Sequence, residues 1–485
     1  MKDLVLDIGT SSCKGAVIED DGRVLAQSQE AYPLVYPGRG LAELNPLLVF
    51  EKVKSCIKKL SPFAADAAGM SISGIGESFV FLDGENRILN NWIMYTDERC
   101  RGMERELIQT LGAEGIWNHT GVYPNESLSF FRLQWWKRHH PEIWNKIRKI
   151  LFTNDLFYFL FTGEGGVDPA TASKTLLYDI HKRDWSPQML REAGVEREWL
   201  SPIRDFGDFI GFVEPRLARE LGLPSGIKLY MGAHDQVSAA LGGGVQHTGE
   251  GLMGEGSTES VNILTDEGIF QKSRLLLEKK MFLEPYVLPG RYLLPVSFLT
   301  YGSVVRWLFQ WLNQGQEGEL EKNAQEPTEL IFLPHFSKVH SMDASRGVPG
   351  ALVGLDFDTK PGEVYRSLLQ GLNFETRLNL QMLKDLQIPF TKAILSGGLS
   401  RSRLFCQIKA DVLEQEIHVL QDFQGGLLGL KIIAMTGGNR AGDCQEAMKR
   451  MEPEKQTYTP MKDYSRLFGR YVQVRQRLMG TNERF

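Results

Sequence analysis

The opening residues of the chain alternate between short apolar runs and turn-forming residues, a pattern typical of β-strands. Residues 4–6 form an apolar run that ends at Asp7, and residues 14–19 form a second run after a Gly-Thr-Ser turn. Asp21-Gly22 is a strong hairpin signal, and residues 23–28 supply a third strand. The first thirty residues therefore predict a three-stranded meander whose first turn carries polar side chains.

A similar pattern returns in the second half of the chain. Residues 251–255 lead into Gly256-Ser257-Thr258, and residues 260–264 follow as a strand, about 245 residues after the first hairpin. The repetition indicates two related halves. We place their boundary at the three glycines 242–244, because three glycines in succession cannot hold a rigid element together. The expected domains are residues 1–243 and residues 244–485.

Helical and strand patterns alternate through both halves. Helical patterns cover residues 46–60, 128–139, 236–241, 364–383, 405–413 and 464–478, and strand patterns cover residues 69–73, 228–231 and 393–395. Such alternation favours an α/β fold. The length of 485 residues also requires more than one domain, because a single hydrophobic core stops growing at about 250–300 residues.

Composition excludes several classes of protein. A net charge of -5 argues against a nucleic-acid binder, which usually has a basic excess. The most apolar stretch, residues 151–161, is too short to span a bilayer, and the N-terminus lacks the apolar region of a signal peptide. Five scattered cysteines show no spacing for zinc or for a redox disulfide. We therefore expect a cytoplasmic protein that binds neither membranes nor nucleic acids.

The first turn is a candidate phosphate site. Asp7 stands where a strand ends, and Thr10, Ser11, Ser12 and Lys14 follow as hydrogen-bond donors and positive charge. Backbone N–H groups and hydroxyls of such a turn can surround phosphate oxygens, and the carboxylate can hold Mg²⁺, usually through water. An ordinary polar hairpin is the alternative. The second turn, Gly256-Ser257-Thr258, favours the phosphate site because it offers the same chemistry again.

Asp235 is a candidate general base. It follows the strand at residues 228–231 and begins a helix, where it could accept the proton of a hydroxyl that attacks a phosphoryl group. The alternative is a purely stabilising helix N-cap, a position that aspartate favours. His234 beside it is expected to pack or hydrogen-bond rather than to bind a metal, because no other His or Cys has matching spacing.

Three further segments carry candidate ligand-binding residues. Gly397-Gly398 follows a strand and allows a ring or a phosphate to approach the backbone closely. Glu77 follows another strand, and Asp97 and Arg99 lie in a charged loop. Carboxylates and an arginine on loops suit a ligand rich in hydroxyl groups, whereas solvated loop charge is the plainer interpretation.

In this order and at these separations, the motifs resemble the FGGY family of carbohydrate kinases, within the actin-like and sugar-kinase ATPase superfamily. Residues 7–14 and 256–258 resemble its two phosphate motifs, residues 232–236 its catalytic segment, and residues 396–411 its adenosine motif. Residues 129–135 and 168–179 resemble further family signatures. The resemblance implies two ribonuclease-H-like (actin-like ATPase) domains with the active site in the cleft between them.

The resemblance also implies the cofactors ATP and Mg²⁺ and the roles of individual residues. Asp7 and Asp235 would share the magnesium environment, and Asp235 would deprotonate the substrate hydroxyl. The expected ATP-binding residues are Thr10, Ser11, Ser12, Lys14, Gly256, Ser257, Thr258, Gly397, Gly398 and Ser402. The expected substrate-binding residues are Gly76, Glu77, Asp97, Arg99, Asp235 and Gln236. The resemblance leaves a homodimer open.

The expected substrate is a small sugar or polyol, such as a ketose similar to xylulose or ribulose. Its identity stays open, because Gly76-Glu77 matches neither the Arg-Glu pair of glycerol kinases nor the Met-His pair of xylulokinases. Two other functions stay open as well. One is a chaperone-like or filament-like ATPase, and the other is a sugar-sensing pseudokinase that transfers no phosphate.

Overall fold

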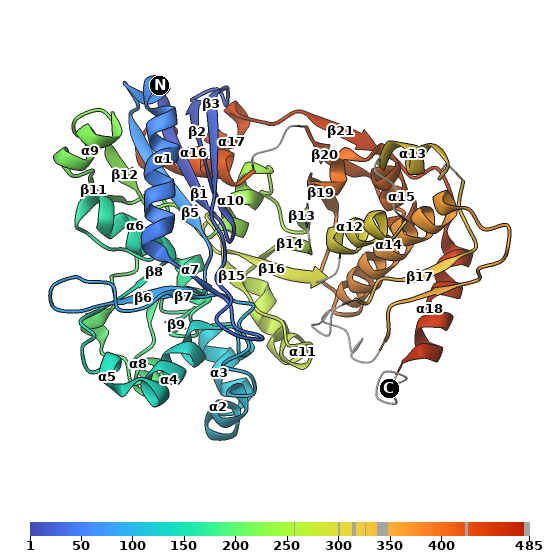
Figure 1. Cartoon of the computed structure of the whole chain (residues 1–485), viewed down its shortest axis with the longest axis horizontal. Helices are drawn as coiled ribbons and strands as arrows, with labels where there is room; N and C mark the ends of the chain where they lie inside the picture. The colour runs from blue at the N-terminus through green and yellow to red at the C-terminus, as the bar shows by residue number, and fades with distance from the viewer. Residues whose placement is uncertain are drawn as a thin grey trace.

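Two mixed β-sheets organise the chain, one in each half, and the halves lie side by side (Figure 1). The structure is a computed structural model, and it describes residues 1–256, 258–298, 301–312, 317–324, 326–336, 348–421 and 425–479. The first half is blue to green in Figure 1, and the second half is yellow to red. No helix among these residues is long and apolar enough to cross a membrane.

The N-terminal sheet begins with the expected meander. Its strands are β1 (Lys2–Ile8), β2 (Ser12–Glu19), β3 (Val24–Ala31), β5 (Gly69–Gly74), β11 (Phe209–Phe212) and β12 (Lys228–Tyr230), in the order β11-β12-β5-β1-β2-β3. β1, β2 and β3 pair antiparallel, β5 runs parallel to β1, and β12 runs parallel to β5. The three-stranded meander predicted from the first thirty residues is therefore confirmed.

The C-terminal sheet repeats this arrangement. Its strands are β13 (Glu250–Glu255), β14 (Glu259–Asp266), β15 (Glu284–Pro285), β16 (Arg291–Phe298), β19 (Lys392–Gly397), β20 (Ile417–Leu420) and β21 (Lys455–Tyr458). β13, β14 and β16 pair antiparallel, β19 runs parallel to β13, and β20 runs parallel to β19. The same order and directions in both sheets confirm the two related halves that the repeated hairpin predicts.

Helices cover both sheets. The helices of the first half are α1 (Pro46–Ala64), α2 (Glu104–Leu111), α3 (Ala113–Thr120), α4 (Ser129–His139), α5 (Pro141–Trp144), α6 (Thr153–Thr162), α7 (Pro169–Ser173), α8 (Pro187–Ala193), α9 (Pro215–Leu221) and α10 (Asp235–Gly242). Those of the second half are α11 (Ser273–Glu278), α12 (Gly302–Trp311), α13 (Glu317–Lys322), α14 (Pro361–Asp385), α15 (Arg403–Leu413), α16 (Gly425–Gly437), α17 (Cys444–Arg450) and α18 (Ser465–Leu478). Every helical pattern of the sequence thus corresponds to a helix.

Short strands and single turns complete the fold. Among the described residues, two-stranded sheets pair β4 (Glu43–Leu44) with β7 (Trp92–Ile93), β6 (Phe79–Leu82) with β8 (Lys149–Phe152), β9 (Tyr178–Asp179) with β10 (Asp184–Trp185), and β17 (Ile331–Leu333) with β18 (Ala351–Val353). In the described part of the chain, 3₁₀ turns cover Arg197–Trp199, Glu267–Lys272 and Leu399–Arg401.

The helices α10 and α16 cross between the halves, and each packs on the other half's sheet. Leu427 and Leu430 of α16 lie in one cluster with Val5 of β1, whereas α10 belongs to the core of the C-terminal sheet. A Cβ atom at Gly429 would lie 1.9 Å from the backbone oxygen of Ser238 in α10. The crossing therefore requires a residue without a side chain at this point.

Gly242, which we expected to loosen the chain, is part of this crossing. It is the last residue of α10, and a Cβ atom there would lie 2.2 Å from the backbone oxygen of Gly425. Its physical role is close helix packing rather than flexibility. Gly244, with a φ of +87°, makes the turn that follows. The domain boundary at residues 243 and 244 stays a prediction.

Candidate active site

Three carboxylates that the sequence singles out gather where neighbouring strands of the N-terminal sheet end. Asp7 lies near the end of β1, Glu77 follows β5, and Asp235 follows β12. The carboxyl ends of these three strands meet at one edge, because the strands are parallel neighbours. The charges of Asp7 and Glu77 act on the carboxyl group of Asp235, so the three side chains share one environment.

The first turn holds Asp7 in a defined position. The Ser73 hydroxyl donates a hydrogen bond of 2.7 Å to an Asp7 carboxylate oxygen. The Tyr32 hydroxyl also holds the turn, because it donates a hydrogen bond of 2.7 Å to the backbone oxygen of Gly9. The first residues of α16 face the same carboxylate, because a Cβ atom at Gly426 would lie 3.6 Å from its carboxyl carbon. The positive end of the α16 dipole therefore favours negative charge at this position.

Asp235 is the first residue of α10, but it does not cap the helix. The N-cap position belongs to His234, and no side chain makes a capping hydrogen bond there. The interpretation of Asp235 as a stabilising N-cap is therefore wrong. Its side chain is 29% exposed, which leaves the carboxylate accessible. Burial, opposed by His234 and aided by the charge of Asp7, raises the pKa of Asp235 to about 6.

His234 connects Asp235 to the second half of the chain. Its Nε2 atom lies 3.2 Å from an Asp235 carboxylate oxygen, and its Nδ1 atom lies 2.5 Å from a carboxylate oxygen of Glu284 in β15. Burial opposes the charge on the ring, but the two carboxylates outweigh it and raise the pKa of His234 to about 9. The protonated ring can therefore donate to both carboxylates at neutral pH.

Lys174 completes this chain of charges. Its ammonium group lies 3.4 Å from the second carboxylate oxygen of Glu284, which is fully buried. Lys174 belongs to the first half and Glu284 to the second, so the ion pair spans the two halves. The expectation that His234 packs or hydrogen-bonds is confirmed by these contacts.

Glu77 is held by its backbone, which leaves its side chain for other contacts. Its backbone oxygen accepts hydrogen bonds from Ser129 at 2.8 Å and from the buried Arg132 at 3.0 Å. The half-buried Glu77 carboxylate acts on the hydroxyl of Tyr95, which is also close to Asp235 and Thr10. Tyr95 thus joins the Glu77 side of the site to the first turn.

Gly76 makes room for the neighbouring charges rather than offering a contact of its own. A Cβ atom at this position would lie 2.9 Å from Cγ of Lys174 and 3.0 Å from Cδ2 of His234. A larger residue would displace the two side chains that hold Glu284. The glycine therefore supports the site through packing.

Asp97 and Arg99 are bound to each other. Arg99 donates to both carboxylate oxygens of Asp97, at 2.8 and 2.9 Å, and also to Glu43 at 2.7 Å. The backbone N–H of Ala42 donates to Asp97 at 2.7 Å, and Arg99 lies over the ring of Trp135. Asp97 is 5% exposed, so the interpretation of this loop as solvated charge is wrong for Asp97.

Gln236 points from α10 toward the second half. Its side-chain oxygen accepts a hydrogen bond of 2.9 Å from the amide of Asn262 in β14. Gln236 is therefore a second link, beside His234, between the helix of the candidate base and the C-terminal sheet.

The second turn and the Gly397-Gly398 turn meet at Glu255. Gly397 pairs with Glu255 across β19 and β13, and a Cβ atom at Gly397 would lie 2.6 Å from the Glu255 backbone oxygen. Gly256 and Thr258 of the second turn and both glycines of the other turn are exposed, whereas Ser257 lies outside the described residues. These two turns thus present backbone to solvent at one edge of the C-terminal sheet.

The remaining residues expected to bind ATP differ in their exposure to solvent. Ser11 and Lys14 are exposed, and Thr10 and Ser12 are half-buried. Ser402 is the N-cap of α15, where its hydroxyl accepts from the N–H of Phe405 at 3.1 Å and donates to Glu321. The structure thus gives Ser402 a stabilising role in the helix.

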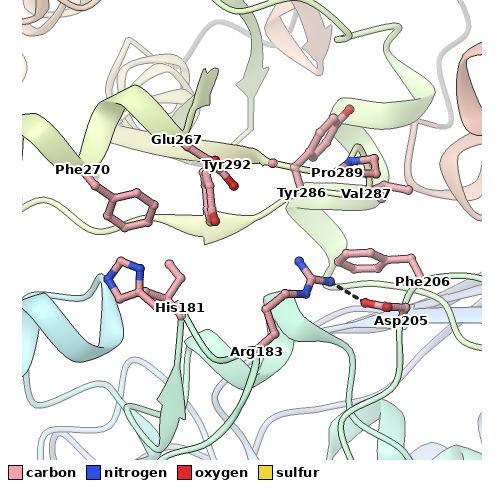
Figure 2. A pocket seen from close by; sticks show the side chains of 12 residues that line it. His181, Arg183, Asp205, Phe206, Glu267, Phe270, Tyr286, Val287, Pro289 and Tyr292 are labelled. Carbon is pink, nitrogen blue, oxygen red and sulfur yellow. Dashed lines mark hydrogen bonds and ion pairs between the residues drawn. The ribbon is translucent and has the colours of Figure 1, made fainter.

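A cavity elsewhere contains none of the expected site residues. It measures about 770 Å³, and Figure 2 shows His181 and Arg183 of the first half facing Phe270 and Tyr292 of the second. Glu267, which also lines it, follows the end of β14 that is remote from the second turn. Eight residues of strand put that end roughly 25 Å from the turn. This cavity is therefore distinct from the candidate site.

Sequence reasoning missed several residues of the site. Glu284 carries no local signal, because its partner His234 is 50 residues away in the sequence. Tyr95 begins the charged loop of Asp97 and Arg99, but the sequence gives its own side chain no role. Lys174 lies in a segment with a family signature, but its sequence alone gives it no chemical role. Ser73 was recognised only as the end of a strand.

Comparisons with known proteins agree with this arrangement. Residues 3–242 match the N-terminal domain of the FGGY family of carbohydrate kinases, and residues 268–437 match its C-terminal domain. The chain is 24% identical over 487 residues to a xylulose kinase of Bacillus subtilis, covering 97% of this chain and 95% of that protein. It is 23% identical over 479 residues to an L-fuculokinase of Salmonella typhi, covering 94% and 97%.

A solved structure has the same fold. The xylulose kinase from Rhodospirillum rubrum superposes with a TM-score of 0.87 at 23% identity, covering 99% of each chain. The two duplicated α/β halves are thus the two domains of an actin-like fold. Since the two family domains together span most of its length, the chain belongs to the FGGY family of carbohydrate kinases, which are ATP-dependent phosphotransferases that act on an alcohol group.

Proposed function

We propose that this kinase phosphorylates a hydroxyl group of a small ketose or polyol, with Asp235 as the general base. The observation that carries the proposal is the meeting of Asp7, Glu77 and Asp235 at the ends of three parallel strands. A carboxylate that is 29% exposed and surrounded by other carboxylates can accept the proton of an attacking hydroxyl. The relatives named xylulose kinase and L-fuculokinase support a sugar as the acceptor.

The two turns are proposed to bind ATP from opposite sides. The first turn, with Thr10, Ser11, Ser12 and Lys14, belongs to the N-terminal sheet, and the second turn, with Gly256 and Thr258, belongs to the C-terminal sheet. Exposed backbone at Gly397 and Gly398 offers a surface for the adenosine group. Glu77, with its backbone already held, is the proposed contact for the sugar hydroxyls.

Asp7 and Asp235 fit a magnesium ion that arrives with ATP. Within the described part of the chain, no cluster of three or more His, Cys, Asp or Glu side chains could hold a metal by itself. Mg²⁺ in kinases needs only one or two carboxylates, because phosphate oxygens and water supply the other ligands. When bound, the ion would neutralise charge on the phosphates. Ser73 holds Asp7 so that one carboxylate oxygen is fixed and the other is left for such a contact.

Two expectations from the sequence remain proposals. All five cysteines are free thiols, which supports a reducing compartment such as the cytoplasm. A homodimer is proposed only from the family resemblance.

The substrate can be identified by measuring ADP release. The purified protein, with ATP and Mg²⁺, would be assayed with ketoses, aldoses, sugar acids and polyols, including xylulose, ribulose, fuculose, gluconate and glycerol. We expect ADP release that depends on one class of sugar or polyol. ADP release at the same rate without any acceptor would instead favour an ATPase, and no release with any compound would favour a sugar-sensing pseudokinase.

A further inference from the structure

Lys409 is a fully buried cation beneath the second turn. It lies in α15, and its side chain is 0% exposed. Its ammonium group donates hydrogen bonds to Glu255 at 2.5 Å, to Glu259 at 2.7 Å and to the Tyr301 hydroxyl at 2.9 Å. A lysine ammonium has three protons to donate, and these three contacts use all of them.

The two carboxylates stand at the two ends of the turn. Glu255 is the last residue of β13, Glu259 is the first residue of β14, and the two face each other across the antiparallel pair. Both are buried, with 0% and 1% of the side chain exposed. Two like charges opposite each other would repel, which would tend to open the hairpin at its turn. Lys409 removes this repulsion by binding both carboxylates.

The network also fixes the surroundings of the turn. Glu259 accepts a hydrogen bond from Thr376 of α14 at 2.8 Å, and the Glu255 backbone packs against Gly397. Burial and the charge of Glu259 raise the pKa of Glu255, whereas the charge and the hydrogen bond of Lys409 lower it and favour the ionised carboxylate. The ends of the turn are thus tied to α14, to α15 and to the Gly397 turn at once.

Such a network is a costly way to stabilise a fold. Replacing buried ionic groups by apolar residues of similar volume is often neutral or stabilising, whereas removing one partner is strongly destabilising. The carboxylates of this network stand at both ends of one turn, which indicates that the network positions the turn rather than stabilises the fold. We propose that Lys409 is a positioning residue that holds the two described ends of the second turn, at Gly256 and Thr258, in place to bind the phosphates of ATP. This inference rests on the proposed role of that turn.

The test separates position from stability by removing all three charges together. In K409M/E255Q/E259Q no buried charge is left without a partner, so we expect a melting temperature within a few degrees of the wild type. The control is E278Q, which alters an exposed glutamate of α11 outside this network. The measurements are the melting temperature, the Kd of a non-hydrolysable ATP analogue with Mg²⁺, and the KM values for ATP and for the accepted sugar.

We expect the triple variant to bind the ATP analogue at least tenfold more weakly and to show the same rise in the KM for ATP. Its KM for the sugar should stay within twofold of the wild type, and E278Q should resemble the wild type in every measurement. A folded triple variant that binds the analogue as tightly as the wild type would overturn the proposal. The binding measurement needs no turnover, so a wild type without kinase activity would refute the proposed function separately.

E259Q provides the second variant if the triple variant does not fold. It leaves Lys409 bound to Glu255 and Tyr301 but weakens its hold on β14. We expect it to bind the ATP analogue three- to tenfold more weakly at nearly unchanged melting temperature. Unchanged binding would overturn the proposal. Failure of E259Q to fold would also overturn it, because the network would then serve folding itself.

Discussion

The Nδ1 atom of His234 lies 2.5 Å from a carboxylate oxygen of Glu284, and this contact joins the helix of the candidate base to a strand of the other half. His234 and Glu284 are both buried, and the other ring nitrogen of His234 faces Asp235. The position of the base therefore depends on the relative placement of the two halves.

Replacing Glu284 should impair catalysis more than ATP binding. In E284Q the amide can still contact His234, but Lys174 and His234 lose their negative partner. We expect kcat to fall about 10- to 100-fold, because a misplacement of about 1 Å can cost about 10²-fold in rate. The KM for ATP should change less than threefold. The control is E278Q, which alters an exposed glutamate of α11. If E284Q kept the wild-type kcat, the contact between Glu284 and His234 would not be needed for catalysis.

Glu77 should determine affinity for the sugar. A half-buried carboxylate that accepts sugar hydroxyls is left without a partner when a hydroxyl is missing, at a cost of about 2–4 kcal/mol. We expect E77A to raise the sugar KM at least tenfold and the ATP KM little, whereas E85A on an exposed hairpin should change neither.

A deoxy analogue of the sugar tests this contact directly. The analogue should lose affinity for the wild type but lose little more for E77A. Additive losses, with coupling below a few tenths of a kcal/mol, would show that Glu77 does not contact that hydroxyl.

Asp7 should set the requirement for magnesium. The proposed ion has few protein ligands, so the loss of one carboxylate should weaken it strongly. We expect D7A to need a higher Mg²⁺ concentration for half-maximal rate, with a smaller effect on the sugar KM. D21A, which alters an exposed turn, is the control. Full activity of the wild type in excess chelator would refute the role of the metal.

Asp155 should make stability depend on pH. Burial raises the pKa of Asp155 from 3.8 to about 7, and its Oδ2 makes no hydrogen bond with any residue that the structure describes. As the pH rises, the Asp155 carboxyl group loses its proton at a lower pH in the unfolded chain than in the folded chain. The free energy of unfolding therefore falls as the pH rises from about 4 to about 7. A difference of this size corresponds to roughly 4 kcal/mol.

The variant D155N removes this ionisation. At pH 8 we expect it to raise the free energy of unfolding by about 1–3 kcal/mol, less than the full penalty because a buried amide also costs energy. At pH 5 the gain should be smaller. Denaturant unfolding at both pH values measures the difference, and a gain independent of pH would contradict the assignment.

Much of the fold could be predicted because its signals are local. The meander of residues 2–31 and the second hairpin follow from turn pairs and short apolar runs, and their repetition reveals the duplication. The flexible role expected for Gly242 was wrong, because the sequence gives no sign that a helix 180 residues later crosses at that glycine.

The candidate site could be predicted only in part, for the same reason. Asp7, Glu77 and Asp235 stand at the ends of strands, where local patterns mark them. Glu284 meets His234 only in the folded chain, from 50 residues away. The role of Lys409 is even harder to predict, because a lysine on a helix is expected to face solvent. Its two carboxylate partners are also about 150 residues away in the sequence.

The most direct test of the account compares D235N with the wild type. Asparagine keeps the shape of the side chain but cannot accept the hydroxyl proton, and general-base catalysis contributes about 10²–10⁴-fold to the rate. Sugar-dependent ADP release and the Kd of a non-hydrolysable ATP analogue would be measured for both proteins. The account predicts a kcat at least a hundredfold lower in D235N with ATP-analogue binding within threefold of the wild type. A kcat above about a tenth of the wild-type value would show that another residue is the base.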